Sequence, residues 1–381
     1  MKKWLKRALR PRTPHPTLIN VFLSQKAVTH NLQIFRGLAA GASVAPVLKS
    51  NAYGHGLVPV AEIVSKEKVP FIIVDSYFEA RTLRNEGIDT PLLIIGYSLP
   101  EDIFGNRLKN IAFTITSLSS LKDIAEKAKG KALRKAKRNI SLHIKIDTGM
   151  HRQGILIQEK EEATKIVRGN PYLILEGISS HLAESGNTDT KFTEQQIAQW
   201  NSCVTYFRQE FPALKYWHLA NTDGHFHAHI QANVTRLGIG LYGIHGPKEL
   251  IPVMRIETIV TSLRMIAAGE SVGYDRTFTA DSEMKVATIP FGYYEGFDRR
   301  LSNKGCVEIA GVYCPIVGRV SMNITSVDVS EIEDVKIGDK VTVISDVRAD
   351  KNSFEEIAKA CDTISYEMVV RISPLLKRVV V

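Results

Sequence analysis

The sequence predicts an α/β fold, in which a (β/α)8 barrel of the TIM type over residues 17–250 is followed by a mostly β domain over residues 251–381. First, short apolar runs rich in β-formers alternate eight times with longer segments of helical periodicity. Second, the length of this region is close to the ~250 residues of one closed barrel. Third, the pattern changes near residue 250, after which β-rich runs are separated only by short turns.

The barrel strands are predicted where apolar β-formers cluster, and the helices where apolar residues recur at helical spacing. Strands that alternate with helices form a parallel sheet with helical crossovers. The predicted strands cover residues 43–49, 71–75, 91–96, 112–116, 141–147, 174–180, 215–220 and 236–242. The predicted helices between them cover residues 57–67, 77–87, 118–129, 159–169 and 191–210.

The second domain is predicted from β-rich runs with a single helical segment at 353–361. A further strand-like run at 17–23 precedes the barrel and could pair with either domain. The predicted strands of the second domain cover residues 255–266, 285–292, 306–319, 341–346 and 363–372.

The excess positive charge is confined to the start of the chain. The net charge is +9, yet residues 1–61 contain nine Lys or Arg and no acid, so the other residues carry 40 bases and 40 acids. We therefore predict a basic N-terminal arm over residues 1–16 on a neutral body, and a nucleic-acid partner is not favoured. A second basic run at 127–138 indicates a solvated helix face, with contact to a polyanion as the alternative.

Composition also bears on location. No apolar run approaches the ~20 residues that cross a bilayer, so no membrane span is predicted. The basic start lacks the apolar stretch of a secretory signal. The four cysteines form no CxxC pair, which is typical of a reducing compartment and predicts a cytoplasmic protein without a metal site.

Polar residues gather where the predicted barrel strands end, which is the rim that carries the active sites of such barrels. Lys145 alternates with apolar Ile144 and Ile146, so its side chain is expected to point into the barrel. The rim therefore resembles an anion-binding site with an internal amine. Its polar residues are Lys49, Lys145, Arg152, His181, His218, Asn221, Thr222 and Arg236.

Lys49 is the candidate nucleophile of this rim. A lone lysine at a strand end is usually a solvated charge, but this one lies between an apolar run and a Gly-rich loop. A lysine that is desolvated beside other cations has a lowered pKa and can form a Schiff base. Gly238, in the LGIG segment after Arg236, could offer backbone N–H groups to a phosphate, although this motif is weak alone.

Motifs recur along the whole chain, beginning with VLKSNAYGHG at 47–56 around Lys49. The other barrel motifs are KIDTGMHRQG at 145–154, SHLA at 180–183, HLANT at 218–222 and RLGIGLYG at 236–243. Those of the second domain are VGYDRTF at 272–278, PFGYYEG at 290–296, VGRVSMN at 317–323 and ISYE at 364–367. Taken together and in this order, these motifs resemble the alanine racemase family over residues 17–381, and VLKSNAYGHG is similar to the family's pyridoxal phosphate lysine motif.

The resemblance implies two catalytic bases and a bound pyridoxal 5'-phosphate. Lys49 would hold the cofactor covalently and act as one base. Tyr274 would be the opposite base, contributed across the interface of a homodimer with shared active sites. The two bases would flank the substrate Cα, because racemisation removes a proton from one face and returns one to the other.

The resemblance also implies the remaining roles. Arg236 would face the pyridine nitrogen, oriented by His218, and His181 would pack on the ring. Arg152 would approach the substrate carboxylate, and Lys145 matches a lysine that is carbamylated in many members. The phosphate and the rest of the cofactor would be held by Tyr53, Asn221, Thr222, Gly238, Ile239 and Tyr366. Substrate access would be lined by Tyr293 and Met322.

The implied activity is interconversion of L-alanine and D-alanine, which would supply D-alanine for peptidoglycan. A racemase of serine, lysine or a broader range is the alternative, because His151 and Asn323 depart from the usual family residues, Gly and Asp. Two further alternatives are a decarboxylase of the same fold, which would lack this setting of Arg236, and a protein that only holds the cofactor. A polyanion-binding protein that uses residues 1–12 and 127–138 is the alternative from another class.

Overall fold

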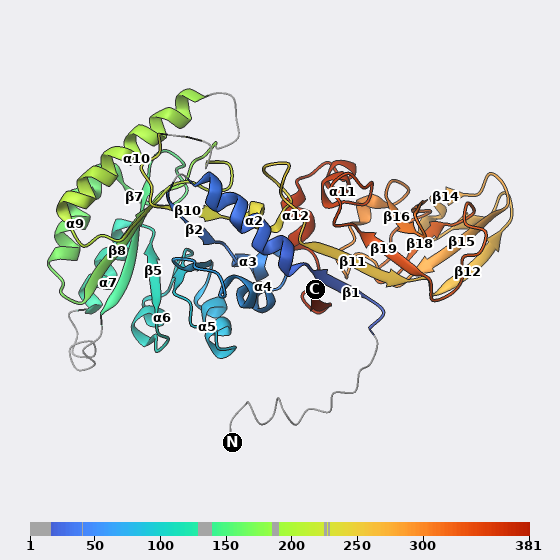
Figure 1. The fold of residues 1–381 in the computed structure, drawn as a ribbon, viewed down its shortest axis with the longest axis horizontal. Coiled ribbons are helices and arrows are strands. Elements are labelled where there is room, and N and C mark those ends of the chain that lie inside the picture. The colour runs from blue at the N-terminus through green and yellow to red at the C-terminus, as the bar shows by residue number, and fades with distance from the viewer. Residues whose placement is uncertain (1–16, 40, 129–138, 185–189, 225–226, 228) are drawn as a thin grey trace, which may run out of the picture. The chain divides into compact units, whose positions relative to one another are not determined.

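The computed structural model describes residues 17–39, 41–128, 139–184, 190–224, 227 and 229–381 (Figure 1). The predicted basic arm and residues 129–138 of the second basic run lie outside the described residues. The chain packs as two compact units. The larger unit comprises Phe22–Arg255, Ile344–Pro374 and Val380–Val381, and the smaller unit is built around Ile256–Val343.

Eight parallel strands form the barrel of the larger unit, as predicted. Six of them run in the order β3-β4-β5-β6-β8-β9, and β10 pairs with β2. A bridge from Val47 to Ile73 joins β2 to β3, and the Asn233 N–H donates to the Trp217 carbonyl beside β9 at 3.1 Å, which closes the ring. The strands are β2 (Ser43–Pro46), β3 (Ile72–Val74), β4 (Leu92–Ile94), β5 (Ile111–Ile115), β6 (Ile140–Asp147), β8 (Leu173–Ser179), β9 (Tyr216–His218) and β10 (Val234–Leu237).

The barrel helices follow the strands as the periodicity predicts, with two additions, α2 and α6, neither of which was predicted (Figure 1). Helix α2 was not predicted, although Ser24 caps it by accepting from the Ala27 N–H at 3.1 Å and Val28, Leu32 and Phe35 are buried on one face. The helices are α2 (Gln25–Leu38), α4 (Leu57–Val64), α5 (Tyr77–Asn85), α6 (Pro100–Gly105), α7 (Leu118–Ala128), α9 (Lys160–Arg168) and α10 (Thr190–Glu210). A short strand β7 (Ile155–Leu156) pairs with β6 and leads into η1 (Ile157–Glu159).

The last barrel strand is shorter than predicted. β10 ends at Leu237, and the following Ile239–Tyr242 segment forms the 3₁₀ helix η3 instead of continuing the strand. The Tyr242 hydroxyl donates to the Val47 carbonyl at 2.9 Å, and the whole segment is buried. Tertiary packing thus overrides the strand preference of this apolar run.

The strands of the second domain form one larger and two smaller sheets. The predicted strand at 17–23 forms β1 (Asn20–Leu23), which lies between β11 and β20. The six-stranded sheet contains β17 (Val312–Pro315), β16 (Cys306–Ile309), β19 (Lys340–Ile344), β11 (Met254–Ile259), β1 and β20 (Lys377–Val380). A three-stranded sheet contains β12 (Ser262–Ile266), β15 (Met284–Ile289) and β18 (Thr325–Asp328). A two-stranded sheet contains β13 (Ser271–Val272) and β14 (Phe278–Thr279). Two segments, η4 (Tyr274–Arg276) and η5 (Arg299–Leu301), are 3₁₀ helices.

One predicted strand is wrong. Residues 363–372 contain the helix α12 (Ser365–Val370), which buries Met368 and Val369, while the predicted helix at 353–361 is present as α11 (Phe354–Ala360). The β-branched residues of this run favour a strand locally, but packing against α11 selects a helix. Ile344–Pro374, which the predicted boundaries place in the β domain, pack within the larger unit.

Within the described part of the chain, no helix combines the length and apolar character needed to cross a membrane.

Candidate functional site

A cavity of about 760 Å³ lies at the carboxyl ends of the barrel strands, within the larger unit. This volume is in the range of small-molecule sites. The structure brings most of the predicted site residues together here. The predicted residues that line the cavity are Lys49, Tyr53, Lys145, Arg152, His181, His218, Asn221, Thr222, Arg236, Gly238, Ile239 and Tyr366.

Lys49 and Tyr53 are presented by an unusual turn. The short helix α3 (Lys49–Tyr53) follows β2, and its residues 50–53 are wound left-handed, with φ between 51° and 56°. This conformation costs roughly 1–2 kcal/mol for each residue with a Cβ. The segment was expected to be a Gly-rich loop, and the structure corrects this: four non-glycine residues form a strained turn of the kind that clusters at functional sites.

Hydrogen bonds and close packing hold this turn in place. The Asn51 side-chain oxygen accepts from the Leu57 N–H at 2.8 Å, and Glu79 accepts from the Asn51 N–H at 3.3 Å. Gly54 ends the turn, and a Cβ at this position would lie 1.9 Å from the Val369 carbonyl oxygen of α12. Helix α12 therefore supports the turn that presents Lys49 while its Tyr366 lines the same cavity.

Hydrogen bonds anchor the Arg236 side chain and leave one N–H donor, at Nε, unused by the described residues. Its guanidinium is 8% exposed and donates to the carbonyls of His218 (2.7 Å), Ser180 (2.7 Å) and Leu219 (2.9 Å). It also donates to Nδ1 of His218 at 2.8 Å and to Nδ1 of His181 at 3.1 Å. All these bonds use the terminal nitrogens, and none of the described residues accepts from Nε. Burial lowers the pKa of Arg236 to about 10, so it keeps its charge near neutral pH.

The donors of Arg236 fix the protonation of two further rings. A guanidinium can only donate, so Nδ1 of His218 is an acceptor and its proton lies on Nε2. That Nε2 is 3.0 Å from Nδ1 of His143, which must then accept, so the His143 proton also lies on Nε2. Burial, followed by the charge of Arg236, lowers the pKa of His218 well below its usual value and that of His143 to about 3. Both rings are therefore neutral.

Burial and the neighbouring cations lower the pKa of both Lys145 and His181. Burial is the main cause that lowers the pKa of Lys145 to about 8, and the charges of Arg236, Arg152 and Lys49 add to it. The pKa of His181 falls to about 3, again mainly through burial and then through Arg236. His181 is thus a neutral ring that accepts from Arg236, and a substantial fraction of Lys145 is an unprotonated amine at mildly alkaline pH.

One end of the cavity fits a phosphate group. Burial raises the pKa of Tyr53 to about 12 and also raises that of Tyr366, so both phenols keep their donor protons. Gly238 leaves room beside Tyr53, because a Cβ there would lie 3.0 Å from the Tyr53 hydroxyl. Ile239 begins η3, where helical geometry leaves N–H groups without intrahelical partners. Thr222 adds a hydroxyl that accepts from the Gly240 N–H at 3.3 Å.

The residues present fit pyridoxal 5'-phosphate at three points. They supply an amine at Lys49, donors for a phosphate around Gly238, and the unused Nε–H of Arg236 for an aromatic nitrogen.

The other predicted site residues lie in the smaller unit. Tyr274, Tyr293 and Met322 are exposed there by 69%, 43% and 55%. Tyr274 begins η4, whose Asp275 and Arg276 have positive φ, and Asp275 forms an ion pair with Arg319 at 2.7 Å. Asn323 donates to Glu295 at 2.7 Å, so the residue that replaces the usual Asp is held in place.

Sequence reasoning missed several residues of the cavity, and His143 behind it. His143 is two positions before Lys145 on β6, and the period of two that pointed Lys145 inward applies equally to it. Thr114, whose buried hydroxyl has no partner in the described residues, gave no such signal. The other cavity residues that were not predicted include Asp75, Ile95, Gly96, Tyr97, Gln153, Ser179, Ser180 and Glu367.

Comparisons with known proteins agree along the chain. The family model described as "Alanine racemase, N-terminal domain" matches residues 23–246, and "Alanine racemase, C-terminal domain" matches residues 253–380. An alanine racemase of Methanococcus maripaludis is 34% identical, with 96% of this chain and 98% of that protein covered. An alanine racemase of Staphylococcus carnosus is also 34% identical, with 96% of this chain and 94% of that protein covered.

Solved structures show the same likeness. The alanine racemase of Bacillus anthracis with bound L-Ala-P has a TM-score of 0.86 at 28% identity, with 97% of this chain and 96% of that chain covered. The alanine racemase of Bartonella henselae with covalently bound pyridoxal phosphate has a TM-score of 0.82 at 25% identity, with 96% of this chain and 100% of that chain covered.

Proposed function

This chain belongs to the alanine racemase family, and on that premise we propose how its residues interconvert L-alanine and D-alanine. The observation that carries the proposal is the cavity in which the Lys49 amine and the anchored Arg236 guanidinium both face a space of about 760 Å³. Lys49 would hold pyridoxal 5'-phosphate covalently. The bound cofactor withdraws electrons from the substrate Cα and makes its proton removable.

Several residues of the cavity would hold the cofactor. Arg236 would direct its remaining Nε–H at the ring nitrogen, and it would donate there without giving up the proton because its pKa of about 10 stays well above neutral pH. His181 packs on the ring, while His218 keeps Arg236 in position. The phosphate is held by Tyr53, Thr222, Tyr366 and the backbone N–H groups of Gly238 and Ile239, with Asn221 beside them.

Two bases exchange the proton at the substrate Cα. Lys49 Nζ acts on one face and Tyr274 Oη on the other, so that a proton leaves one face and another returns to the opposite face. We propose that the active unit is a homodimer and that Tyr274, Tyr293 and Met322 serve the partner's cavity. The exposure of all three side chains in a single chain supports this assignment.

Arg152 binds the substrate carboxylate, and we propose that Lys145 is carbamylated beside it. Carbon dioxide reacts with an unprotonated amine, and the low pKa of Lys145 supplies one near pH 8. The carbamate would place a negative charge among Arg152, Arg236 and Lys49, whose charges disfavour a protonated Lys145.

Carbamylation of Lys145 predicts a pH-dependent label. With ¹³C-bicarbonate at pH 8.5, NMR should show a carbamate carbon that weakens as the pH falls to 6, since the amine is protonated below its pKa of about 8. Lys145→Arg should abolish this signal, whereas Lys359→Arg, at an exposed lysine, should keep it. A carbamate signal that persists in Lys145→Arg would contradict the assignment.

The product D-alanine is a precursor of peptidoglycan, and we propose that the enzyme supplies it in the cytoplasm. The four cysteines support a reducing compartment, because none of them is in a disulfide bond within the described residues and three of them are buried.

The proposed function is tested by a racemisation screen. Purified protein loaded with pyridoxal 5'-phosphate should interconvert L- and D-alanine to an equal mixture, and it should act on serine and lysine much more slowly. Chiral chromatography of each amino acid measures the outcome. Faster turnover of serine or lysine than of alanine would contradict the assigned substrate.

A further inference from the structure

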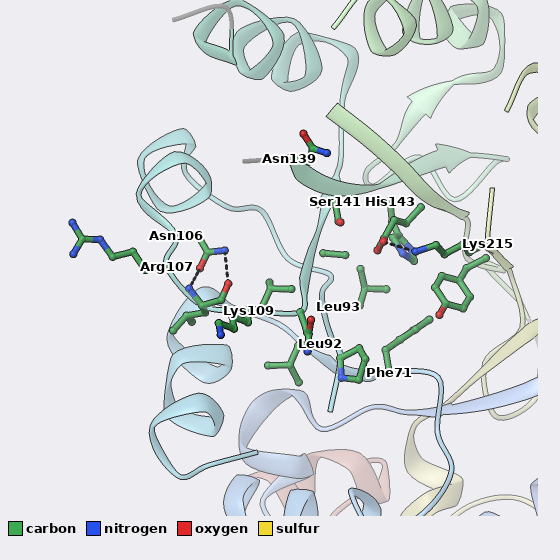
Figure 2. A pocket seen from close by; sticks show the side chains of 17 residues that line it. Phe71, Leu92, Leu93, Asn106, Arg107, Lys109, Asn139, Ser141, His143 and Lys215 are labelled. Atoms are coloured by element: carbon green, nitrogen blue, oxygen red, sulfur yellow. Dashed lines mark hydrogen bonds and ion pairs between the residues drawn. The ribbon is translucent and has the colours of Figure 1, made fainter. Parts of the chain in front are cut away.

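A second cavity, of about 720 Å³, lies at the opposite end of the barrel, within the larger unit (Figure 2). Its lining residues stand at or just before the first residues of the strands: Phe71 precedes β3, Ile111 begins β5 and Tyr216 begins β9. The proposed racemase site uses the other ends of these strands. This cavity therefore has no part in the reaction described above.

The floor of the second cavity is apolar and aromatic. Phe71, Leu93 and Ala112 belong to one buried cluster, with 3%, 1% and 6% exposure. Tyr216 packs edge-on against Phe71, with ring centroids 5.0 Å apart. Tyr216 is only partly buried against this cluster, so a ligand with an apolar body would gain free energy by covering its ring.

His143 supplies a buried hydrogen-bond donor at this floor. The ring lines the cavity and is only 1% exposed. Its Nδ1 accepts from His218, so Nε2 carries the proton and points away from His218. None of the described residues accepts a hydrogen bond from this Nε2–H. The Nε2–H can therefore donate to a ligand that brings an acceptor into the cavity.

Lys215 supplies a positive charge at the second cavity. Its ammonium donates to Glu176 at 2.9 Å, which uses one of three N–H donors. Its charge is also one of the causes that lower the pKa of His143, so the two groups act on the same region. In Figure 2, Lys215, His143 and Phe71 lie toward one side of the cavity, whereas the Arg107 side chain extends away from it.

We propose that this second cavity binds a small monocarboxylate with an apolar body, whose carboxylate accepts from His143 Nε2 and from Lys215. The two oxygens of one carboxylate can accept one hydrogen bond from the imidazole of His143 and one from the ammonium of Lys215. A phosphate dianion fits less well, because the carboxylate of Glu176, which already pairs with Lys215, repels a dianion more strongly than a monoanion. The ligand would lie three hydrogen bonds from Arg236, the first from His143 to the ligand and the other two through His143, His218 and Arg236.

The probe is 3-phenylpropionate, and 3-phenylpropan-1-ol is its neutral counterpart. Titration calorimetry of the cofactor-loaded enzyme should show binding of the acid and at least tenfold weaker binding of the alcohol. Lys215→Met keeps the side-chain stem and should weaken the acid about tenfold, the usual value of a charge-assisted hydrogen bond. Arg107→Met removes a nearby charge that points elsewhere and should leave the affinity unchanged.

A second pair of variants tests the location. Ser141→Phe places a ring in the cavity from β6 and should abolish binding, whereas Ser141→Ala should not. Lys49→Ala and saturating L-alanine should both leave the affinity intact, since they act at the other end of the barrel. Thermal unfolding checks that each variant is folded, and Lys215 is exposed enough for its variant to fold.

Three results would overturn the proposal. They are no binding of the acid at millimolar concentration, equal affinity for acid and alcohol, and displacement of the acid by L-alanine. Each of these leaves the proposed racemase function standing, because the alanine assay is independent of the titration.

Discussion

Lys49→Ala should reduce alanine racemisation by at least about 10⁴-fold, because the variant loses both a proton-transferring base and the covalent attachment of the cofactor. The left-handed turn places this amine in the cavity, and alanine keeps the backbone while removing it. Chiral assay measures the rate. Borohydride reduction followed by peptide mapping should place the cofactor on Lys49 in the wild-type enzyme and on no peptide in the variant.

The control for this experiment is Lys248→Ala, which removes an exposed lysine of the same unit and should leave activity and labelling intact. Lys145 is the other lysine that lines the cavity. Borohydride labelling of Lys145 in the wild-type enzyme would show that the covalent role has been assigned to the wrong amine.

Tyr274→Phe should lower racemisation in both directions by about 10²–10⁴-fold, the usual cost of losing a positioned base. The change keeps the ring and deletes only the phenolic group. In deuterium oxide, NMR should still show exchange of the Cα proton of D-alanine through Lys49, while exchange from L-alanine should nearly stop. Tyr294→Phe is the matched control, because Tyr294 is also exposed, by 53%, in the same unit.

Equal exchange from both enantiomers in Tyr274→Phe would show that another group is the second base. The same variant also tests the shared site. When inactive Lys49→Ala and Tyr274→Phe chains are mixed and allowed to exchange subunits, a mixed dimer contains one intact cavity, so part of the activity should return. Proven subunit exchange without recovered activity would count against a site completed by the partner.

The sequence by itself determined the barrel and most of its rim, because both depend on short-range patterns. Eight apolar runs separated by helical segments can be satisfied by a ring of parallel strands. Strand ends then place polar residues such as Lys49 and His181 at one rim, whatever the details of packing. The structure gathers these residues around one cavity, as this reasoning requires. Arg236 opens the predicted strand 236–242, and only the observed β10, which ends at Leu237, brings it near that rim.

Only the tertiary structure decided the conformations that local preference opposes. Apart from Asn51, residues 50–53 have little intrinsic tendency to wind left-handed, and the turn persists because Asn51, Glu79 and the α12 backbone hold it. Helix α12 itself forms against the strand preference of its β-branched residues, because its apolar face is buried.

Tertiary structure also decided where the protons of the barrel interior lie. A sequence does not show that His143, His218 and Arg236 meet, since 75 residues separate the two histidines. Once they are in contact, the guanidinium can only donate, and each ring in turn must accept on Nδ1 and carry its proton on Nε2. The direction of this chain is a property of three side chains brought together by the closed barrel, which no local pattern contains.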